Sequence, residues 1–405
     1  MCWKVRKFLF FSIYIGIFAT LWYRLFWWLF CVLCAMSGLY LHIPFCKKIC
    51  AYCDFFRVAD LRALEPTLRA MHEEMDAERD FLSDSKLRTI YFGGGTPSLV
   101  APSQIASFIE HADKLWGCGD VEELTLEANP DDINKEFVSE LRATPINRIS
   151  LGVQSFDDDE LLFMNRRHTS AEAVDAVKRL QDSGLENITI DLIFGVDGFD
   201  HRVLSRSVEQ AIALGVQHIS AYHLTIEPRT LFYKRLQCGE MCEVAEEVSQ
   251  QEFMLVHDML TAAGFEHYEV SNYALKGYRA RHNSSYWHGA QYLGIGPGAH
   301  SYNGEIRRWS EQSVGGYCVR REYESEKLSE IDHRNEYIMT SLRCAEGIDT
   351  EYFKTRFGEQ ALMHVMGLAQ RWTASGDLCF EQGWLKIPAR RFLISDAIIE
   401  SLFEA

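Results

Sequence analysis

The sequence predicts an α/β fold, in which a parallel sheet forms a partial (β/α)6 barrel and a smaller α+β module follows. Two observations lead to this class. After residue 36, apolar runs alternate with helix-like segments, and that alternation is typical of a parallel sheet covered on both faces. Six such units are too few for a closed eight-unit barrel, so we expect a partial one with its functional residues at the carboxyl ends of the strands.

The six strands are predicted from short apolar, β-branched runs at residues 39–43, 89–92, 123–126, 148–153, 188–194 and 218–224. The helices between them are predicted at residues 61–81, 103–115, 135–142, 170–183 and 201–214. Because each strand precedes its helix, the loops that leave the strands all open at the same end of the barrel.

The pattern changes after a glycine-containing break near residues 304–316. Helices are predicted at residues 335–342, 350–357 and 360–375, and a two-stranded hairpin follows with its turn at Gln382-Gly383. Helices followed by a small hairpin predict a winged-helix-like module. We therefore divide the chain into an apolar segment at 1–35, a barrel with its extension at 36–304, and a C-terminal domain at 305–405.

Three cysteines follow the first predicted strand with the spacing C-x3-C-x2-C, namely Cys46, Cys50 and Cys53. Thiolates this close in one loop can converge on a metal centre. No fourth cysteine is near, so an iron–sulfur cluster held here would keep one iron open for a ligand, as catalytic zinc sites do. The alternatives are a zinc site with His42 as a fourth ligand and three unrelated buried thiols.

Polar motifs follow the later strands as well. A glycine-rich turn at residues 93–98 carries no lysine, so it is not a phosphate-binding P-loop. Glu127, Gln154 and Asp191 lie at or within the next strands, and Arg166 lies just beyond one of them. A carboxylate such as Asp191 in an apolar strand requires a partner. Each residue alone could be structural, but together they predict a polar ring around one opening.

Composition and charge restrict the partners and the compartment. The chain has 405 residues and a formal net charge of −16, which argues against a nucleic-acid partner held through its phosphates. Twelve cysteines in a chain of this length do not form the disulfide framework of a small secreted protein. Thiols and cluster chemistry both indicate a reducing cytoplasm.

The first 35 residues differ from the rest, because they contain no Asp or Glu and are almost wholly apolar from residue 8 onwards. A membrane anchor is one interpretation, although Arg24 near its middle would cost about 3 kcal/mol on insertion. A signal peptide would export an iron–sulfur protein to the wrong compartment. We favour a third interpretation, in which translation begins at Met36.

The cysteine spacing, with Tyr52 before the last cysteine, resembles the radical SAM superfamily, and the flanking residues resemble the relatives of oxygen-independent coproporphyrinogen III oxidase. The resemblance implies a radical SAM barrel whose [4Fe–4S] cluster binds S-adenosylmethionine (SAM) at its open iron. It assigns the contacts with SAM to a set of residues around the barrel mouth: Tyr40, Tyr52, Gly94, Gly95, Thr96, Glu127, Gln154, Arg166 and Asp191.

A second motif, His-Asn-x-x-Tyr-Trp, begins at His282. It resembles the stretch associated with haem binding in the haem chaperones of this superfamily, which implies that His282 binds haem. An imidazole is the commonest axial ligand of haem iron, and Tyr or Trp can pack on a porphyrin face. A hydrogen-bonded core histidine is the alternative.

Two functions compete within the family. The oxidases carry a further cysteine where this chain has Phe55. They usually also carry an extra segment before the cluster strand, and we expect a chain that starts at Met36 to lack it. We therefore predict a haem chaperone that delivers haem to acceptor haemoproteins, with coproporphyrinogen III oxidation as the alternative. Whether SAM is cleaved stays open, as do membrane association through residues 1–35 and a homodimer.

Overall fold

The computed structural model describes residues 37–82 and 86–404. Twelve strands form one curved sheet in the order β12-β11-β10-β9-β1-β2-β3-β4-β5-β6-β8-β7. The central strands β1 to β6 run parallel to one another, each paired with the next along the chain. Their bounds are Ser37–Ile43, Leu87–Gly94, Glu123–Ala128, Arg148–Gln154, Ile188–Phe194 and His218–His223. All six predicted strands are therefore confirmed.

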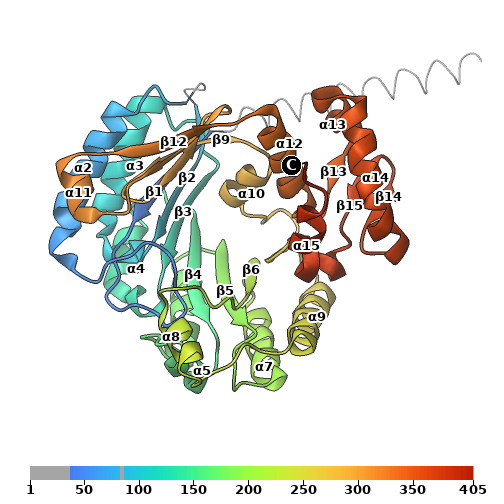
Figure 1. The fold of residues 1–405 in the computed structure, drawn as a ribbon. Coiled ribbons are helices and arrows are strands. Elements are labelled where there is room, and N and C mark those ends of the chain that lie inside the picture. Colours follow the sequence, from blue (N-terminus) through green and yellow to red (C-terminus); the bar gives the residue numbers. More distant parts are fainter. Residues whose placement is uncertain (1–36, 83–85, 405) are drawn as a thin grey trace, which may run out of the picture.

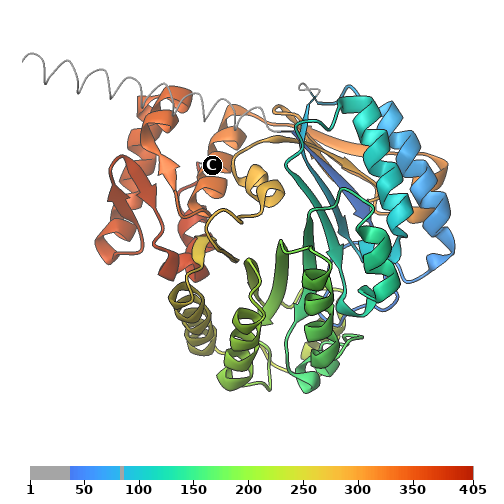
Figure 2. The ribbon, with the colours of Figure 1, turned by 180° about the vertical axis from the view of Figure 1, so that it is seen from behind.

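The helices of the barrel pack on the outer face of this sheet (Figures 1 and 2). They are α2 (Leu64–Ala77), α3 (Pro102–Trp116), α4 (Lys135–Leu141), α6 (Ser170–Asp182) and α7 (His201–Ala213). Six of the seven residues of β1 are buried, and so are six of the seven residues of β5, because helices cover one face of the sheet and barrel side chains fill the other. These helices match the predicted ones except that α2 is preceded by a short 3-10 turn, η1 (Leu61–Ala63).

The sheet extends beyond the predicted barrel on both sides. On one side, β9 (Gln291–Ile295) pairs parallel with β1, and β10 (His300–Tyr302), β11 (Ile306–Ser310) and β12 (Tyr323–Lys327) continue it antiparallel. On the other side lie β8 (Asn272–Ala274) and β7 (Glu266–Glu269). The boundary expected at 304/305 lies between β10 and β11 of this sheet, because β11 pairs with β10 and β12 pairs with β11.

Several helices connect these strands and were not predicted from the sequence. They are α5 (Asp158–Phe163), α8 (Leu231–Gln237), α9 (Glu246–Ala262), α10 (Arg281–Trp287) and α11 (Val314–Val319). Most are short, and their apolar faces are too brief to show a clear helical period. In the folded chain, α10 packs beside β2 and α11 packs against α2.

The C-terminal module contains α12 (Glu330–Leu342), α13 (Thr350–Phe357), α14 (Glu359–Ser375) and α15 (Ser395–Glu400) around a small sheet of order β13-β15-β14. Its strands are β13 (Ile348–Asp349), β14 (Cys379–Glu381) and β15 (Trp384–Lys386), and η4 (Ala389–Ile394) follows. The hairpin turns at Gln382 (φ 51°) and Gly383 (φ 88°), the left-handed pair that a two-residue turn requires. The predicted helices and hairpin are confirmed.

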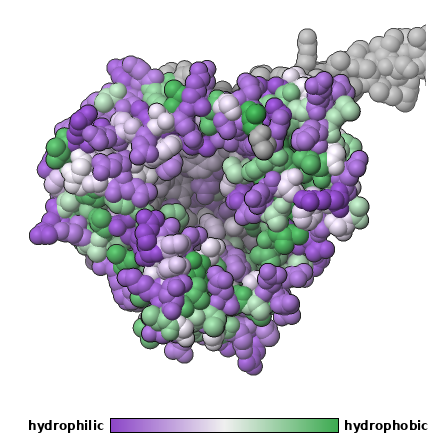
Figure 3. All heavy atoms as spheres, in the orientation of Figure 1, coloured by the Kyte–Doolittle hydropathy of each residue, from purple (hydrophilic) through white to green (hydrophobic). Residues whose placement is uncertain are grey.

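The C-terminal module stands across the open side of the curved sheet, and the face between them is hollowed (Figures 1 and 3). None of the helices in residues 37–82 and 86–404 has the length and apolarity that crossing a membrane requires. The predictions for residues 1–35 and for a start at Met36 lie outside the described residues.

Candidate functional site

The loop that carries the three cysteines follows β1 and is closed at its base by backbone hydrogen bonds. The amide of Cys46 donates to the carbonyl of Val58 at 3.0 Å, and the amide of Val58 donates to the carbonyl of Pro44 at 2.7 Å. These two bonds hold the ends of the loop together at the mouth of the barrel. Cys50 and Cys53 lie within the loop, which brings all three thiols to the carboxyl end of β1.

The tip of the loop is fixed by two other parts of the barrel. The amide of Ala51 donates to the carbonyl of Met164 at 3.0 Å, and its carbonyl accepts from the amide of Phe232 at 2.9 Å. The side-chain amide of Asn165 donates to the carbonyl of Ile49 at 2.7 Å. Since these bonds come from segments far along the chain, the tertiary fold positions the thiols, and the loop sequence alone does not.

The thiols stand among hydrogen-bond donors. The hydroxyl of Thr96 donates to Cys46 Sγ at 3.3 Å, and the guanidinium of Arg166 donates to Cys50 Sγ at 3.1 Å. Burial raises the pKa of Cys46 and raises that of Cys53 to about 11. The thiols of Cys46 and Cys53 are therefore protonated at neutral pH, and metal binding must release their protons. The donors then stabilise the thiolates that remain.

The arrangement suits a cluster better than a single zinc ion. Among the described residues, no three Cys, His, Asp or Glu side chains converge on one ion position. His42, the candidate fourth zinc ligand, instead contacts the hydroxyl of Tyr40 at 3.1 Å and the carbonyl of Phe56 at 3.2 Å. An iron–sulfur cluster is larger than one ion, so its thiolates need not meet at a point. The three cysteines thus fit a [4Fe–4S] cluster.

The glycine-rich turn after β2 is pressed against the cysteine loop. A Cβ at Gly95 would lie 2.7 Å from both the backbone N and O of Phe45, and one at Gly94 would lie 2.8 Å from the ring of His42. Gly94 also has φ +108°, and the amide of Gly95 donates to the carbonyl of Ile43 at 2.9 Å. Only glycine allows this approach. The turn therefore supports the cysteine loop by direct contact, whereas the resemblance implied that its glycines approach SAM.

Two carboxylates lie on barrel strands, Glu127 near the end of β3 and Asp191 in the middle of β5. Glu127 accepts from the hydroxyl of Tyr91 at 2.7 Å and from the amide of Gly94 at 3.1 Å. Asp191 accepts from the hydroxyl of Ser150 at 3.4 Å. Burial raises the pKa of Glu127 to about 7, with Asp191 adding to the rise, and burial raises the pKa of Asp191 to about 6. Both are poised to ionise when a cation binds beside them.

Arg166 and Gln154 complete the ring predicted from the sequence. Arg166 donates to Asn129 Oδ1 at 2.6 Å and to the carbonyl of Gly152, but its buried Nε has no hydrogen-bond partner within the described residues. Gln154 ends β4 with φ 75°, a left-handed conformation that costs a non-glycine residue free energy and is concentrated at functional sites. An orphaned guanidinium nitrogen suits a ligand that brings an acceptor, such as the carboxylate of SAM.

Of the two tyrosines assigned to SAM, one lies on β1 and the other lies in the cysteine loop. Tyr40 is on β1, where its ring lies 5.9 Å from that of Tyr91 and 6.3 Å from that of His282. Tyr52 is within the loop beside the thiol of Cys50. The structure therefore gathers all of the cysteines and strand-end residues named from the sequence at one barrel mouth.

His282 lies apart from any opening. Its side chain is 1% exposed, with Nδ1 2.8 Å from the hydroxyl of Thr89 and Nε2 2.7 Å from the hydroxyl of Tyr286. Its backbone amide donates to Glu123 at 2.9 Å. Because both ring nitrogens are engaged, His282 cannot ligate haem iron in this conformation. The geometry favours the alternative of a hydrogen-bonded core histidine over the ligand.

A charged network beneath the cysteine loop was not identified from the sequence. Buried Asp132 accepts from Lys47 Nζ at 2.7 Å, from Ser98 Oγ at 2.9 Å and from Arg167 at 3.2 Å. It ties the cysteine loop to the glycine-rich turn and to the segment that carries Arg166. The two adjacent acidic residues that follow β3 could have pointed to this network in the sequence. Only the fold shows which basic side chains they contact.

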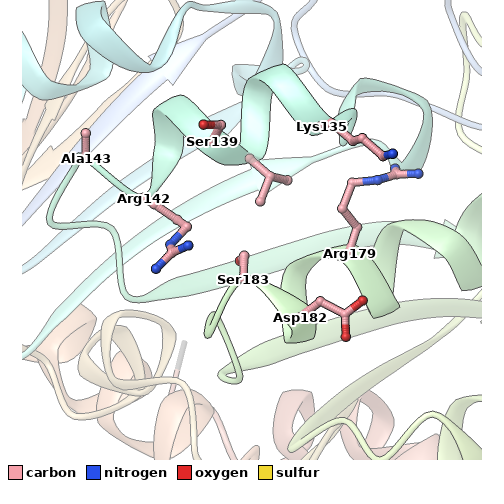
Figure 4. A pocket seen from close by; sticks show the side chains of 8 residues that line it. Lys135, Ser139, Arg142, Ala143, Arg179, Asp182 and Ser183 are labelled. Carbon is pink, nitrogen blue, oxygen red and sulfur yellow. The ribbon is translucent and has the colours of Figure 1, made fainter.

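The described chain also has a shallow hollow of 530 Å³ on the outside of the barrel, between α4 and α6 (Figure 4). Lys135, Arg142 and Arg179 surround it together with Ser139 and Ser183. It opens on the helical surface, whereas the cysteines lie at the strand ends. We assign it no part in the site.

Comparison with known proteins matches two families. The Radical SAM superfamily matches residues 40–211, and the HemN C-terminal domain matches residues 328–394. The second match begins after β12, which agrees with the end of the extended sheet.

Curated relatives extend over most of the chain. The chain is 36% identical to the heme chaperone HemW of Lactococcus lactis subsp. lactis (strain IL1403), over 79% of this chain and 85% of that protein. It is 33% identical to the heme chaperone HemW of Bacillus subtilis (strain 168), over 80% and 87%. For that of Mycobacterium tuberculosis (strain ATCC 25618 / H37Rv) the identity is 32%, over 90% and 94%.

Among solved structures, coproporphyrinogen III oxidase (HemN) from Escherichia coli, described as a radical SAM enzyme, superimposes with a TM-score of 0.79. The match covers 91% of this chain and 90% of that one at 18% sequence identity. At this identity the likeness establishes the shared fold and carries no conclusion about activity.

Proposed function

This chain belongs to the HemW family of the radical SAM superfamily, and from this we propose that it is a haem chaperone. It binds haem, a [4Fe–4S] cluster and SAM, and it delivers the haem to acceptor haemoproteins. The observation that carries the proposal is identity above 30% to heme chaperones over more than four fifths of their length. The same family membership supplies the cluster and SAM as cofactors.

Cys46, Cys50 and Cys53 hold the cluster in this proposal, with Thr96 and Arg166 donating to their sulfurs. When bound, the cluster with SAM at its open iron supplies electron-transfer and radical chemistry. The surrounding side chains bind SAM in this proposal. Arg166 pairs with the carboxylate of SAM, and Glu127 and Asp191 bind its positively charged and hydroxyl groups. The further contacts are made by Tyr40, Tyr52, Gly94, Gly95, Thr96 and Gln154.

The domain organisation is proposed as a radical SAM barrel with its sheet extension, followed by a C-terminal winged-helix-like domain. A cytoplasmic location is part of the same proposal, since a cluster and free thiols need a reducing compartment. Membrane association through residues 1–35 and a homodimer stay predictions.

Coproporphyrinogen III oxidation is the second candidate, because the oxidase from Escherichia coli shares the fold. The side chain at the position where the oxidases carry a further cysteine is Phe55, which is 71% exposed. A phenyl group provides neither a thiolate nor a proton-transfer group there. This difference favours the chaperone.

One anaerobic experiment separates the two functions. The cluster-loaded chain is mixed with coproporphyrinogen III, SAM and a reductant, and in parallel with haem and then an apo-haemoprotein. We expect a Soret band, transfer of haem to the acceptor and no protoporphyrinogen by chromatography. Turnover of coproporphyrinogen III would establish the oxidase instead.

The cluster assignment is tested with a matched pair of variants. Cys46→Ala should abolish iron loading, whereas Cys238→Ala should not, because Cys238 is an exposed thiol at the end of α8. Iron content and the visible spectrum after reconstitution provide the measurement. Equal loss of iron in both variants would reject the three-cysteine site.

A further inference from the structure

A cavity of 1090 Å³ lies between the barrel mouth and the C-terminal module, within the hollow seen in Figure 3. Its walls come from the cysteine loop, α10, the β9–β10 region and the helices α12 and α13. Aromatic side chains are frequent among them, including Tyr40, Phe55, Trp287, Tyr292, Tyr337 and Trp384. A large, mainly apolar cavity with a few polar groups is the usual form of a small-molecule site.

This cavity adjoins the SAM site directly. Tyr40 and His42 at the end of β1, and Asp54, Phe55 and Phe56 after the last cysteine, belong to its lining. A flat aromatic macrocycle held here would therefore touch the loop that carries the cluster ligands. The size, the aromatic walls and this position all suit haem, the cargo of the proposed function.

Four histidines line the cavity, and two of them already use ring nitrogens in hydrogen bonds. His42 is engaged on both sides, by Tyr40 and by the carbonyl of Phe56. His288 donates Nδ1 to the carbonyl of Ser284 at 2.7 Å, which is the ordinary way that a histidine caps the last carbonyls of a helix. Its Nε2 lies free at the end of α10, so His288 is the main rival as a ligand.

The imidazoles of His300 and His333 form no hydrogen bond with any other described residue. His333 stands in the first turn of α12 and stacks on no aromatic ring of the described residues. His300 begins β10 and stacks on Trp309, with ring centroids 5.9 Å apart and planes at 24°.

The guanidinium of Arg307 lies near the imidazole of His300. Arg307 also lines the cavity, where it pairs with Glu336 at 2.7 Å and lies over the ring of Tyr302. A cation beside the ligand gives a carboxylate of the macrocycle a partner at the same wall.

Cys344 also lines the cavity, but it is a poor competitor. It is 6% exposed, and burial raises the pKa of its thiol. A thiol this deeply buried offers little surface to an iron atom in the cavity.

We propose that His300 is the residue of this chain that ligates haem iron, with the macrocycle held in the cavity between the cysteine loop and the C-terminal module. This inference rests on the proposed function and names the haem site within it. It assigns the iron ligand to His300 on β10, after the motif, and not to His282 within the motif, because both ring nitrogens of His282 are engaged in hydrogen bonds.

The test is an anaerobic haem titration of the full, cluster-loaded chain and of His300→Ala, read from the Soret band and from iron electron paramagnetic resonance. We expect His300→Ala to lose the histidine-ligated spectrum and to weaken haem binding by at least about tenfold. Added imidazole should restore the spectrum, since the empty position can accept it, and a merely structural loss would not respond. Iron loading of the cluster and SAM binding should be unchanged.

Matched variants make the outcome decisive. His288→Ala and His333→Ala remove the other cavity histidines with a free ring nitrogen and should titrate like the parent chain. A parental spectrum in His300→Ala, or loss of ligation in either of the other two, overturns this inference while the chaperone function stands. Failure of the parent chain itself to bind haem would overturn both.

Discussion

At the scale of single residues, burial makes the acidic groups of the site harder to ionise than the same groups in water. Burial raises the pKa of Glu127 to about 7, that of Asp191 to about 6 and that of Cys53 to about 11. Iron and the positively charged groups of SAM would supply the charge that ionises these groups. Assembly of the site should therefore release protons and should be favoured as the pH rises.

Glu127→Gln tests this coupling. A carboxylate binds the positive charge of SAM only when ionised, so SAM affinity should fall as the pH drops from 8 to 6 through the pKa near 7. The variant should bind SAM about 10-fold to 150-fold more weakly at pH 8, the effect of losing one charge-assisted contact worth about 1.5–3 kcal/mol. Its affinity should also depend less on pH.

Calorimetry on the cluster-loaded protein at several pH values gives the affinities. Glu140→Gln, on the exposed surface of α4, is the control and should leave both affinity and its pH dependence unchanged. Unaltered SAM binding by Glu127→Gln would exclude this carboxylate from the pocket.

At the scale of elements, the turn after β2 and the cysteine loop behave as one unit. The turn has no room for side chains at Gly94 and Gly95, and the hydroxyl of Thr96 that follows it donates to Cys46. Asp132 ties the same turn to the loop through Ser98 and Lys47. Displacing the turn should therefore displace the thiols.

Gly95→Ala is the corresponding prediction. Its Cβ would meet the backbone of Phe45 at 2.7 Å, so the loop must move, at about 1–3 kcal/mol of stability. We expect the variant to fold but to load much less iron, as measured by iron analysis and the cluster absorbance. Gly119→Ala, whose Cβ would meet nothing within 4 Å, should load iron normally. Full iron loading of Gly95→Ala would contradict the conclusion that the turn supports the cysteine loop.

At the scale of the whole molecule, a buried carboxylate joins the first barrel helix to the far end of the sheet. Glu74 on α2 accepts from the amide of Gly296 at 2.7 Å, from the hydroxyl of Tyr323 at 2.7 Å and from that of Tyr317. Its side chain is 0% exposed. These bonds hold the segment around β9 to β12, and with it one wall of the cavity, against the barrel.

Glu74→Ala would leave three buried donors without a partner. We expect it to lower the free energy of unfolding by about 3 kcal/mol or more, measured as a shift of the urea midpoint by circular dichroism. Glu73→Ala is the neighbouring control: its side chain is 69% exposed and pairs with Arg321, so its loss should change stability by less than about 1 kcal/mol. Equal midpoints for the two variants would refute the role of Glu74.

The order of strands and helices in the barrel, the C-terminal hairpin and the cysteine motif were all determined by local sequence. Strands buried on both faces have an apolar pattern, Gln382-Gly383 favours a left-handed turn, and C-x3-C-x2-C sets three thiols in one loop. The short segments β7 to β12 escaped prediction, because strands of only three to five residues are too short to show a clear period. For the same reason the expected domain boundary at 304/305 fell within the sheet.

Only the tertiary structure decided what each polar residue meets. The sequence named Glu127, Arg166 and Asp191, but their separation along the chain says nothing of hydrogen bonds, burial or pKa. The resemblance of its motif also implied that His282 binds haem, whereas in the folded chain both of its ring nitrogens contact hydroxyl groups, those of Thr89 and Tyr286. A motif is local, but whether an imidazole faces a cavity depends on contacts between residues hundreds of positions apart, and these exist only in the folded chain.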